Sequence, residues 1–270
     1  TGSSTGFQFG SGNGAGGLVN GGTFNLRKVG DGVLTLGDIS STFTGSTRIE
    51  VGEGALRVTS PGSLGAAAVT ARFGQGAALE IDTAGWSPTA VLDQMAGSFE
   101  RWAVDGARSG TVNLPSGVHL QIMQNQTGTQ TINLNGGSIM GYMPRDWDHV
   151  AVITQMGSGL TINLTANSYL GQPFVSSSNG VWDYRFYDLG KQNTMGTDVN
   201  INDQFYRGSY LQIDGAITGA FDLTKTGKDM ILLNGANTYN NTIVEDGILQ
   251  IGRTNGLPVA GALTLKTSTA

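Results

Sequence analysis

The sequence predicts an all-β protein built as a β-solenoid, and three observations support this fold class. Apolar residues alternate with polar ones along many short stretches, as they do in half-buried β-strands. Glycine accounts for 43 of the 270 residues, has no three-residue period, and lies at the breaks between these stretches. One stretch occurs twice, at 26–58 and at 223–251, which is typical of a repeat protein.

The two copies agree at the positions that a stacked β-coil requires. Both begin with Leu-x-Lys-x-Gly, which places Lys28 and Lys225 at equivalent positions. The equivalent apolar pairs are Leu34 with Ile231, Leu36 with Leu233, Leu56 with Leu249, and Val58 with Ile251. Because such a unit cannot bury its apolar face alone, we expect copies to stack and to share ladder hydrogen bonds. A β-sandwich with two similar hairpins is the alternative fold.

We expect a single solenoid over residues 1–270, with repeat copies at 24–85 and 221–270 and a less regular middle at 86–220. The middle still contains short alternating runs at a roughly regular spacing, and we interpret them as degenerate rungs of the same coil. His119 alternates with Val118 and Leu120 in one of these runs. We therefore expect the His119 side chain to be exposed.

A short helix is predicted near 88–96, within this otherwise all-β chain. Ser87 is a suitable N-cap, and Pro88 suits the first helical position. The apolar face of the helix would consist of Val91, Leu92 and Met95.

The composition argues against several classes of function. The net charge is −5, so the chain lacks the basic surface that nucleic acid requires. The apolar runs are far shorter than the roughly 20 residues of a membrane helix, so we expect no membrane insertion in this segment. The chain has no cysteine, which rules out disulfides and thiolate metal sites. The sequence implies no cofactor.

The repeated stretches resemble the passenger-associated repeat of bacterial autotransporters. That pattern is Leu-x-Lys-x-Gly, a Leu-x-Leu strand, Asn-x-Tyr-x-Gly, and then Gly-x-Leu-x-Leu; the second copy departs from it at Asp229 and Asn241, two turn positions. The resemblance implies a right-handed parallel β-helix, export to the bacterial cell surface, and a place in a long tandem array. The repeats of this family carry no catalytic residues, so the resemblance implies no enzyme active site.

Two groups of residues are candidates for contact with a ligand or a neighbouring subunit, and both lie where looped-out arms are expected, at 141–150 and 172–198. The segment 145–149 brings Trp147 together with two carboxylates and a histidine. This segment is either a site for a metal or a sugar, or a solvated polar loop. In the second arm, Trp182, Tyr184 and Phe186 share one face of an alternating run. They form either an exposed contact patch or a local mini-core.

The predicted function is that of a structural or adhesive module of an extracellular bacterial surface stalk or filament, which associates end to end with its neighbours. The candidate assembly strands contain Phe7 and Phe9 near the start, and Leu263 and Leu265 near the end. The expected partner is therefore the chain itself or a neighbouring module, with surface polysaccharide as a further candidate. The alternative is a carbohydrate-binding or polysaccharide-cleaving β-helix, and a third reading is a generic tail-fibre-like β protein.

Overall fold

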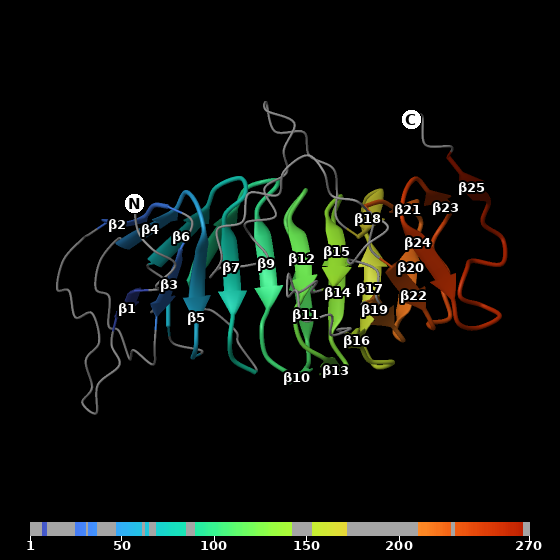
Figure 1. Cartoon of the computed structure of the whole chain (residues 1–270), viewed down its shortest axis with the longest axis horizontal. Helices are drawn as coiled ribbons and strands as arrows, with labels where there is room; N and C mark the ends of the chain where they lie inside the picture. Colours follow the sequence, from blue (N-terminus) through green and yellow to red (C-terminus); the bar gives the residue numbers. More distant parts are fainter. Residues whose placement is uncertain are drawn as a thin grey trace, which may run out of the picture.

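The computed structural model describes residues 7–9, 25–30, 32–36, 47–60, 63–64, 69–84, 90–141, 153–171, 210–227 and 230–266. Within these ranges every regular element is a β-strand. Figure 1 shows the strands stacked side by side along the long axis of the molecule. Among the described residues, no helix is long and apolar enough to cross a membrane.

One long sheet runs through the whole stack. Its eleven strands, in spatial order, are β1 (Phe7–Phe9), β3 (Val33–Leu36), β5 (Ala55–Val58), β7 (Ala78–Ile81), β9 (Phe99–Trp102), β12 (His119–Ile122), β15 (Ser138–Gly141), β18 (Ser168–Leu170), β21 (Leu223–Lys225), β23 (Thr242–Val244) and β25 (Leu263–Leu265). Neighbouring strands are parallel throughout. The parallel order excludes the hairpins of the β-sandwich alternative, because hairpin strands are antiparallel.

Three further sheets close the coils. The N-terminal sheet contains β2 (Asn25–Lys28), β4 (Thr47–Val51), β6 (Val69–Phe73) and β8 (Val91–Gln94). The six-stranded sheet contains β10 (Gly106–Arg108), β13 (Gln126–Gly128), β16 (Ile153–Met156), β19 (Tyr210–Ile213), β22 (Met230–Leu233) and β24 (Ile248–Ile251). The short sheet contains β11 (Thr111–Asn113), β14 (Thr131–Leu134), β17 (Thr161–Leu164) and β20 (Ala216–Gly219).

The regular length of a coil follows from the register of the long sheet. Leu34 pairs with Leu56, 22 residues further along the chain. Leu120 pairs with Ile139, 19 residues further along. A coil with short corners therefore returns to the long sheet after about 20 residues, as in other solenoid repeats. Two coils are longer, since Ser138 pairs with Tyr169 and Ser168 pairs with Leu223. The coils before β9 use two sheets and the coils from β9 to β21 use three, whereas the coils after β21 use two again, without a strand of the short sheet.

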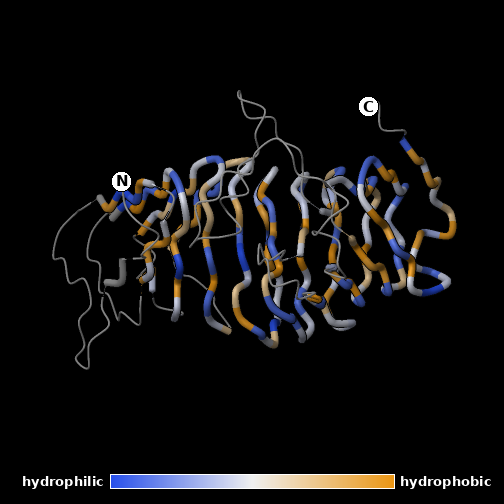
Figure 2. Tube along the Cα trace, in the orientation of Figure 1, coloured by the Kyte–Doolittle hydropathy of each residue, from blue (hydrophilic) through white to orange (hydrophobic). Residues whose placement is uncertain are grey.

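The interior is one apolar core that all four sheets share. Along each strand, alternate residues point inward, and Figure 2 shows hydrophobic and hydrophilic residues alternating along the tube. The predicted core residues Leu34, Leu36, Leu56, Ile231 and Leu233 are buried, and Leu249 packs against the core while partly exposed. The prediction for Ile251 is wrong, because this residue lies in a terminal strand and is 39% exposed.

The helix predicted near 88–96 is wrong over its described part, because Val91–Gln94 is strand β8. This strand pairs in parallel with β6, and Leu92 lies opposite Ala71 in the ladder. Leu92 therefore packs against the core, whereas Val91 points outward and is 55% exposed. The ladder across the neighbouring coil overrides the local helical signal, as tertiary pairing often overrides propensity. Ser87 and Pro88 lie outside the described residues.

Candidate functional site

The lysine of the repeat motif caps the backbone of two successive turns. In the second copy, the Lys225 Nζ donates hydrogen bonds to the carbonyl oxygens of Thr226 and Gly227, both at 2.7 Å. It also donates to the carbonyl of Asp246, at 3.3 Å, which belongs to the turn of the following rung. The side chain is only 1% exposed. A buried ammonium thus ties one rung to the next through three backbone carbonyl oxygens.

The first copy repeats this arrangement. The Lys28 Nζ donates to the carbonyls of Val29, at 3.2 Å, and Gly30, and reaches the carbonyl of Glu53 in the next turn at 3.1 Å. Gly54 follows Glu53 with a φ of +68°, and a Cβ there would lie 2.7 Å from the Lys28 Nζ. The glycine is therefore required both by its backbone conformation and by the approach of the lysine.

The two copies place this lysine turn at different corners of the coil. In the first copy the turn connects the N-terminal sheet to the long sheet, from β2 to β3. In the second copy it connects the long sheet to the six-stranded sheet, from β21 to β22. The repeat motif therefore specifies a turn and its contact with the next rung, and the same turn fits either corner of the coil.

A second polar cluster lies inside the solenoid, where the coil changes from two sheets to three. Glu100 pairs with Leu79 and Leu120 in the ladder, so its carboxylate occupies an inward position. The Trp102 Nε1 donates to the Glu100 Oε1 at 2.8 Å, and the Arg108 guanidinium lies 4.1 Å from the centre of the Trp102 ring. The Arg108 Nε donates to the side-chain oxygen of Gln126.

Burial governs the protonation of this cluster. Desolvation raises the pKa of Glu100, and the hydrogen bond from Trp102 and the charge of Arg108 offset this only in part. Desolvation also lowers the pKa of Arg108 to about 10, opposed by the charge of Glu100. A buried carboxylate beside a cation is a feature that can mark a functional site, but it also occurs in structural ion-pair networks.

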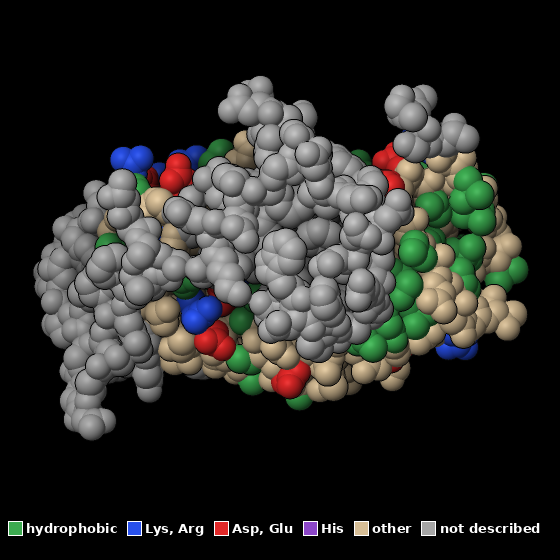
Figure 3. Space-filling model, in the orientation of Figure 1, with side chains coloured by type: hydrophobic (Ala, Val, Ile, Leu, Met, Phe, Trp, Pro, Cys, Tyr) green, Lys and Arg blue, Asp and Glu red, His purple; other side chains and the backbone are tan. Residues whose placement is uncertain are grey.

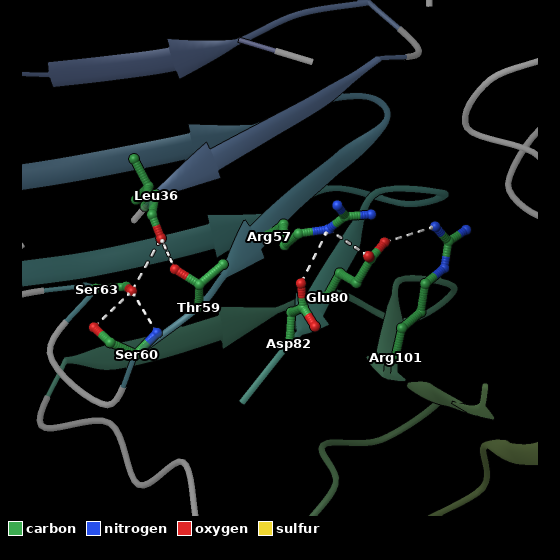
Figure 4. Close-up of polar contacts among 8 residues, drawn as sticks. All are labelled: Leu36, Arg57, Thr59, Ser60, Ser63, Glu80, Asp82 and Arg101. Carbon is green, nitrogen blue, oxygen red and sulfur yellow. Dashed lines mark hydrogen bonds and ion pairs between the residues drawn. The ribbon is translucent and has the colours of Figure 1, made fainter. Parts of the chain in front are cut away.

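The outer face of the long sheet carries a ladder of charges across three rungs, drawn in Figure 4. The Arg57 Nε lies 2.6 Å from the Glu80 Oε1, and an Arg101 nitrogen lies 3.7 Å from the other carboxylate oxygen of Glu80.

A separate group of hydrogen bonds lies at the end of β3. The Leu36 carbonyl accepts hydrogen bonds from the hydroxyls of Ser63, at 3.0 Å, and Thr59, at 3.2 Å. These polar contacts join successive coils of the stack.

The expectation that His119 is exposed is wrong. Its side chain does alternate with the inward Leu120, but it is only 6% exposed. The His119 ring lies 5.3 Å from the Phe99 ring, and its Nδ1 is 3.0 Å from the Ser138 hydroxyl. Desolvation lowers the pKa of His119 to about 4. Alternation along the strand predicts the direction of the side chain correctly, but it carries no information about what covers that face.

The C-terminal end of the stack exposes apolar side chains that inner rungs bury. Leu263 pairs with Thr242, which pairs with Leu223 on the preceding rung. Leu223 is 1% exposed, whereas Leu263 is 53% and Leu265 is 71% exposed. Figure 3 shows hydrophobic side chains gathered at this end of the molecule. This end is therefore a candidate interaction surface.

The four residues predicted to contact a ligand or a neighbouring subunit lie outside the described residues, namely Trp147, Trp182, Tyr184 and Phe186. Phe7 and Phe9 belong to β1, which pairs with β3 of its own chain and forms the end strand of the long sheet. Across the described ranges, no group of three or more His, Asp or Glu side chains is arranged to hold a metal ion.

The four sheets and their parallel register define the chain as a parallel β-solenoid, a class in which each repeat contacts chiefly its neighbours. The family model of the passenger-associated-transport-repeat matches residues 26–58 and 223–251. The chain thus carries two repeats of the β-helical family of autotransporter passengers, which confirms the resemblance seen in the sequence. This is a family of passenger-domain repeats and not a known enzyme family. No curated protein and no solved structure matches the chain.

Proposed function

We propose that this chain is a structural and adhesive module of an extracellular bacterial surface stalk or filament, and that it associates end to end with its neighbours. The passenger repeats and the solenoid fold support its assignment to a surface-exposed passenger. The observation that carries the proposal is the apolar C-terminal rung, with Leu263 and Leu265 more than half exposed.

The geometry of the long sheet favours head-to-tail stacking. Its two outermost strands are β1 and β25, and all of its strands run in the same direction. Among the described strands, β25 and β1 each have a neighbour on one side only, so β25 of one copy can pair in parallel with β1 of the next copy. Such a contact joins two different surfaces, so it does not close on itself and produces an open fibre. The same edges also suit a neighbouring repeat of one longer chain.

The test is the state of association of the intact chain and of a variant with a blocked edge. Leu263→Lys with Leu265→Lys places two charges on the exposed end, as natural proteins do to protect open edges. The control is Thr131→Lys with Thr161→Lys, on the outer face of the short sheet and away from both ends. We expect light scattering and electron microscopy to show fibres or growing oligomers for the intact chain and the control, and monomers for the end variant. An intact chain that stays monomeric at high concentration would contradict the proposal.

The alternative function, a carbohydrate-binding or polysaccharide-cleaving β-helix, depends on arm residues outside the described ranges. It is tested by Asp146→Ala with Asp148→Ala, which removes the two carboxylates of that arm. We expect this double variant to keep every activity of the module. Loss of a polysaccharide-cleaving activity, with the circular dichroism spectrum unchanged, would favour the enzyme instead.

A further inference from the structure

Six side chains on the outer face of the long sheet are almost completely buried, although they point away from the core. This outer patch consists of Glu80, Phe99, Arg101, His119, Gln121 and Met140, of which each is at most 6% exposed. Alternation along β12 fixes the direction of these side chains. Leu120 and Ile122 point into the core, so His119 and Gln121, which alternate with them, point outward. The three other sheets share the apolar core on the inner side of the long sheet, so the patch faces away from them.

The composition of the patch is unlike that of a solvated sheet face. Phe99 and Met140 belong to an apolar cluster that is separate from the solenoid core and also includes Val33, Ala55 and Ala78. On the outer face of the N-terminal sheet, by contrast, the side chains of Arg48, Glu50, Arg72 and Asp93 are all more than 40% exposed. An outer sheet face that is partly apolar and almost completely buried indicates that this part of the long sheet carries a covering layer.

The polar members of the patch also indicate a cover. Arg57, at the edge of the ion-pair ladder, keeps a side-chain exposure of 35%, whereas Glu80 and Arg101 keep 1% and 0%. Among the described residues, the Gln121 Nε2 finds no hydrogen-bond acceptor. Burial of an amide without an acceptor is costly, and an amide on an open sheet face would donate to water instead.

The chain supplies a suitable segment at the adjacent corner of the coil. The long sheet connects to the six-stranded sheet through only three residues after β9 and after β12, namely 103–105 and 123–125. After β18 the same corner contains the segment 172–209, which is outside the described residues and carries Trp182, Tyr184 and Phe186. This segment is both longer and richer in aromatic residues than the corner requires.

The length of this segment is sufficient to reach the patch and return. Its 38 residues can extend outward by about 60 Å at about 3.3 Å per residue, if half of them lead out and half lead back. Three rungs separate β18 from β9, which is about 15 Å at the strand spacing of about 4.8 Å. The segment 142–152, at the corner after β15, is much shorter, and its reach of roughly 15–20 Å leaves little length to cover the patch.

We propose that the outer patch is the docking surface for the segment 172–209 of the same chain, held by its aromatic run against Phe99, His119 and Met140. On this account the aromatic run is the outer layer of a second small core, and the solenoid carries the segment as a fixed decoration on one face. The aromatic side chains of the segment are then partly used for docking and are not all free to contact a ligand.

The titration of His119 reports directly on this cover. The chain has two histidines, so His149→Gln leaves one imidazole whose proton resonances can be followed by NMR. In that background, the parent should show a His119 pKa near the value of about 4 that burial gives. Replacement of 172–209 by a three-residue link should raise the pKa of His119 toward about 6.5, because the ring becomes hydrated. Circular dichroism verifies that the solenoid is retained.

Two further variants keep the test decisive. Trp182→Ala with Tyr184→Ala and Phe186→Ala keeps the length of the chain and should raise the pKa of His119 in the same direction. Replacement of 142–152 by a short link should leave the pKa of His119 near 4. The proposal is overturned if the parent already titrates near 6.5, if neither change to 172–209 moves the pKa, or if only the replacement of 142–152 does so.

Discussion

The lysine turn of the repeat makes a prediction that can be worked out in detail from the structure. Lys225→Met removes the buried ammonium but keeps an unbranched side chain of similar length, so the change in packing is small. Three carbonyl oxygens, those of Thr226, Gly227 and Asp246, then lose their shared donor. We expect this change to weaken both the turn and its contact with the next rung.

The magnitude follows from the two short bonds and the cost of burying the ammonium. A hydrogen bond to a charged group contributes about 1.5–3 kcal/mol, and the two bonds at 2.7 Å are the strong ones. The methionine variant no longer bears the desolvation cost of the ammonium, which offsets part of this loss. We therefore expect the free energy of unfolding to fall by about 3 kcal/mol.

The assay is guanidinium unfolding followed by circular dichroism, with the slope of the transition compared between variants. The matched control is Lys266→Met, whose Nζ pairs with the Glu245 carboxylate at a side-chain exposure of 55%. An exposed pair of this kind contributes about 0–1 kcal/mol. If Lys225→Met costs no more than Lys266→Met, the lysine does not tie the rungs together and the reasoning fails.

Three further predictions follow from burial and backbone geometry. Leu233→Asp places a charge at a fully buried position and should lower the free energy of unfolding by several kcal/mol. Leu232 points outward, so Leu232→Asp should lower it much less. Equal losses would mean that the inward and outward faces of this strand are assigned wrongly. Burial raises the folded-state pKa of Glu100 above 4.5, so the folded chain binds more protons than the unfolded chain. Its free energy of unfolding should therefore fall as the pH rises from 4.5 through the folded-state pKa. Glu100→Gln should remove this fall in a pH series of unfolding curves, and an unchanged dependence of the unfolding free energy on pH would contradict the burial of Glu100. Gly110 has a φ of +79° and open space around the position of a Cβ, so Gly110→Ala should cost about 1–2 kcal/mol of backbone strain. At Gly128 a new Cβ would lie 2.0 Å from a carbonyl oxygen, so Gly128→Ala should lower the thermal stability clearly more.

The sequence predicts the parts of the fold that depend on local pattern. Alternation with a period of two identified the inward leucines, such as Leu36 and Leu56, because a strand residue and its second neighbour always share a face. The repeated Leu-x-Lys-x-Gly motif identified the stacked coils. Its physical role was not visible, since the contact between Lys28 and Glu53 spans 25 residues.

The features that were missed all depend on neighbours across coils. Residues 91–94 matched a helical pattern locally, and only the ladder with β6 makes them a strand. Glu100 was not singled out, because its cluster with Arg108 forms only when the coil changes from two sheets to three. The burial of His119 depends on a layer over the outer face, and the exposure of Ile251 depends on its place in a terminal strand. None of these neighbours can be read from a window of local sequence.

The central claim, that each coil lies in parallel register on the one before it, is tested most directly by paired cysteines. The chain has no cysteine of its own, so an introduced pair has no competing thiol. Thr131 and Thr161 are register partners on the outer face of the short sheet, and Thr111 lies one rung beyond Thr131. Partners on adjacent strands lie at about 4.8 Å, within the range of about 4.4–6.8 Å that a disulfide spans between Cα atoms, whereas a two-rung separation of about 10 Å is too long. On oxidation, mass spectrometry should show an intramolecular disulfide for Thr131→Cys with Thr161→Cys and none for Thr111→Cys with Thr161→Cys. No disulfide in the first pair, or equal bridging in both, would contradict the solenoid register.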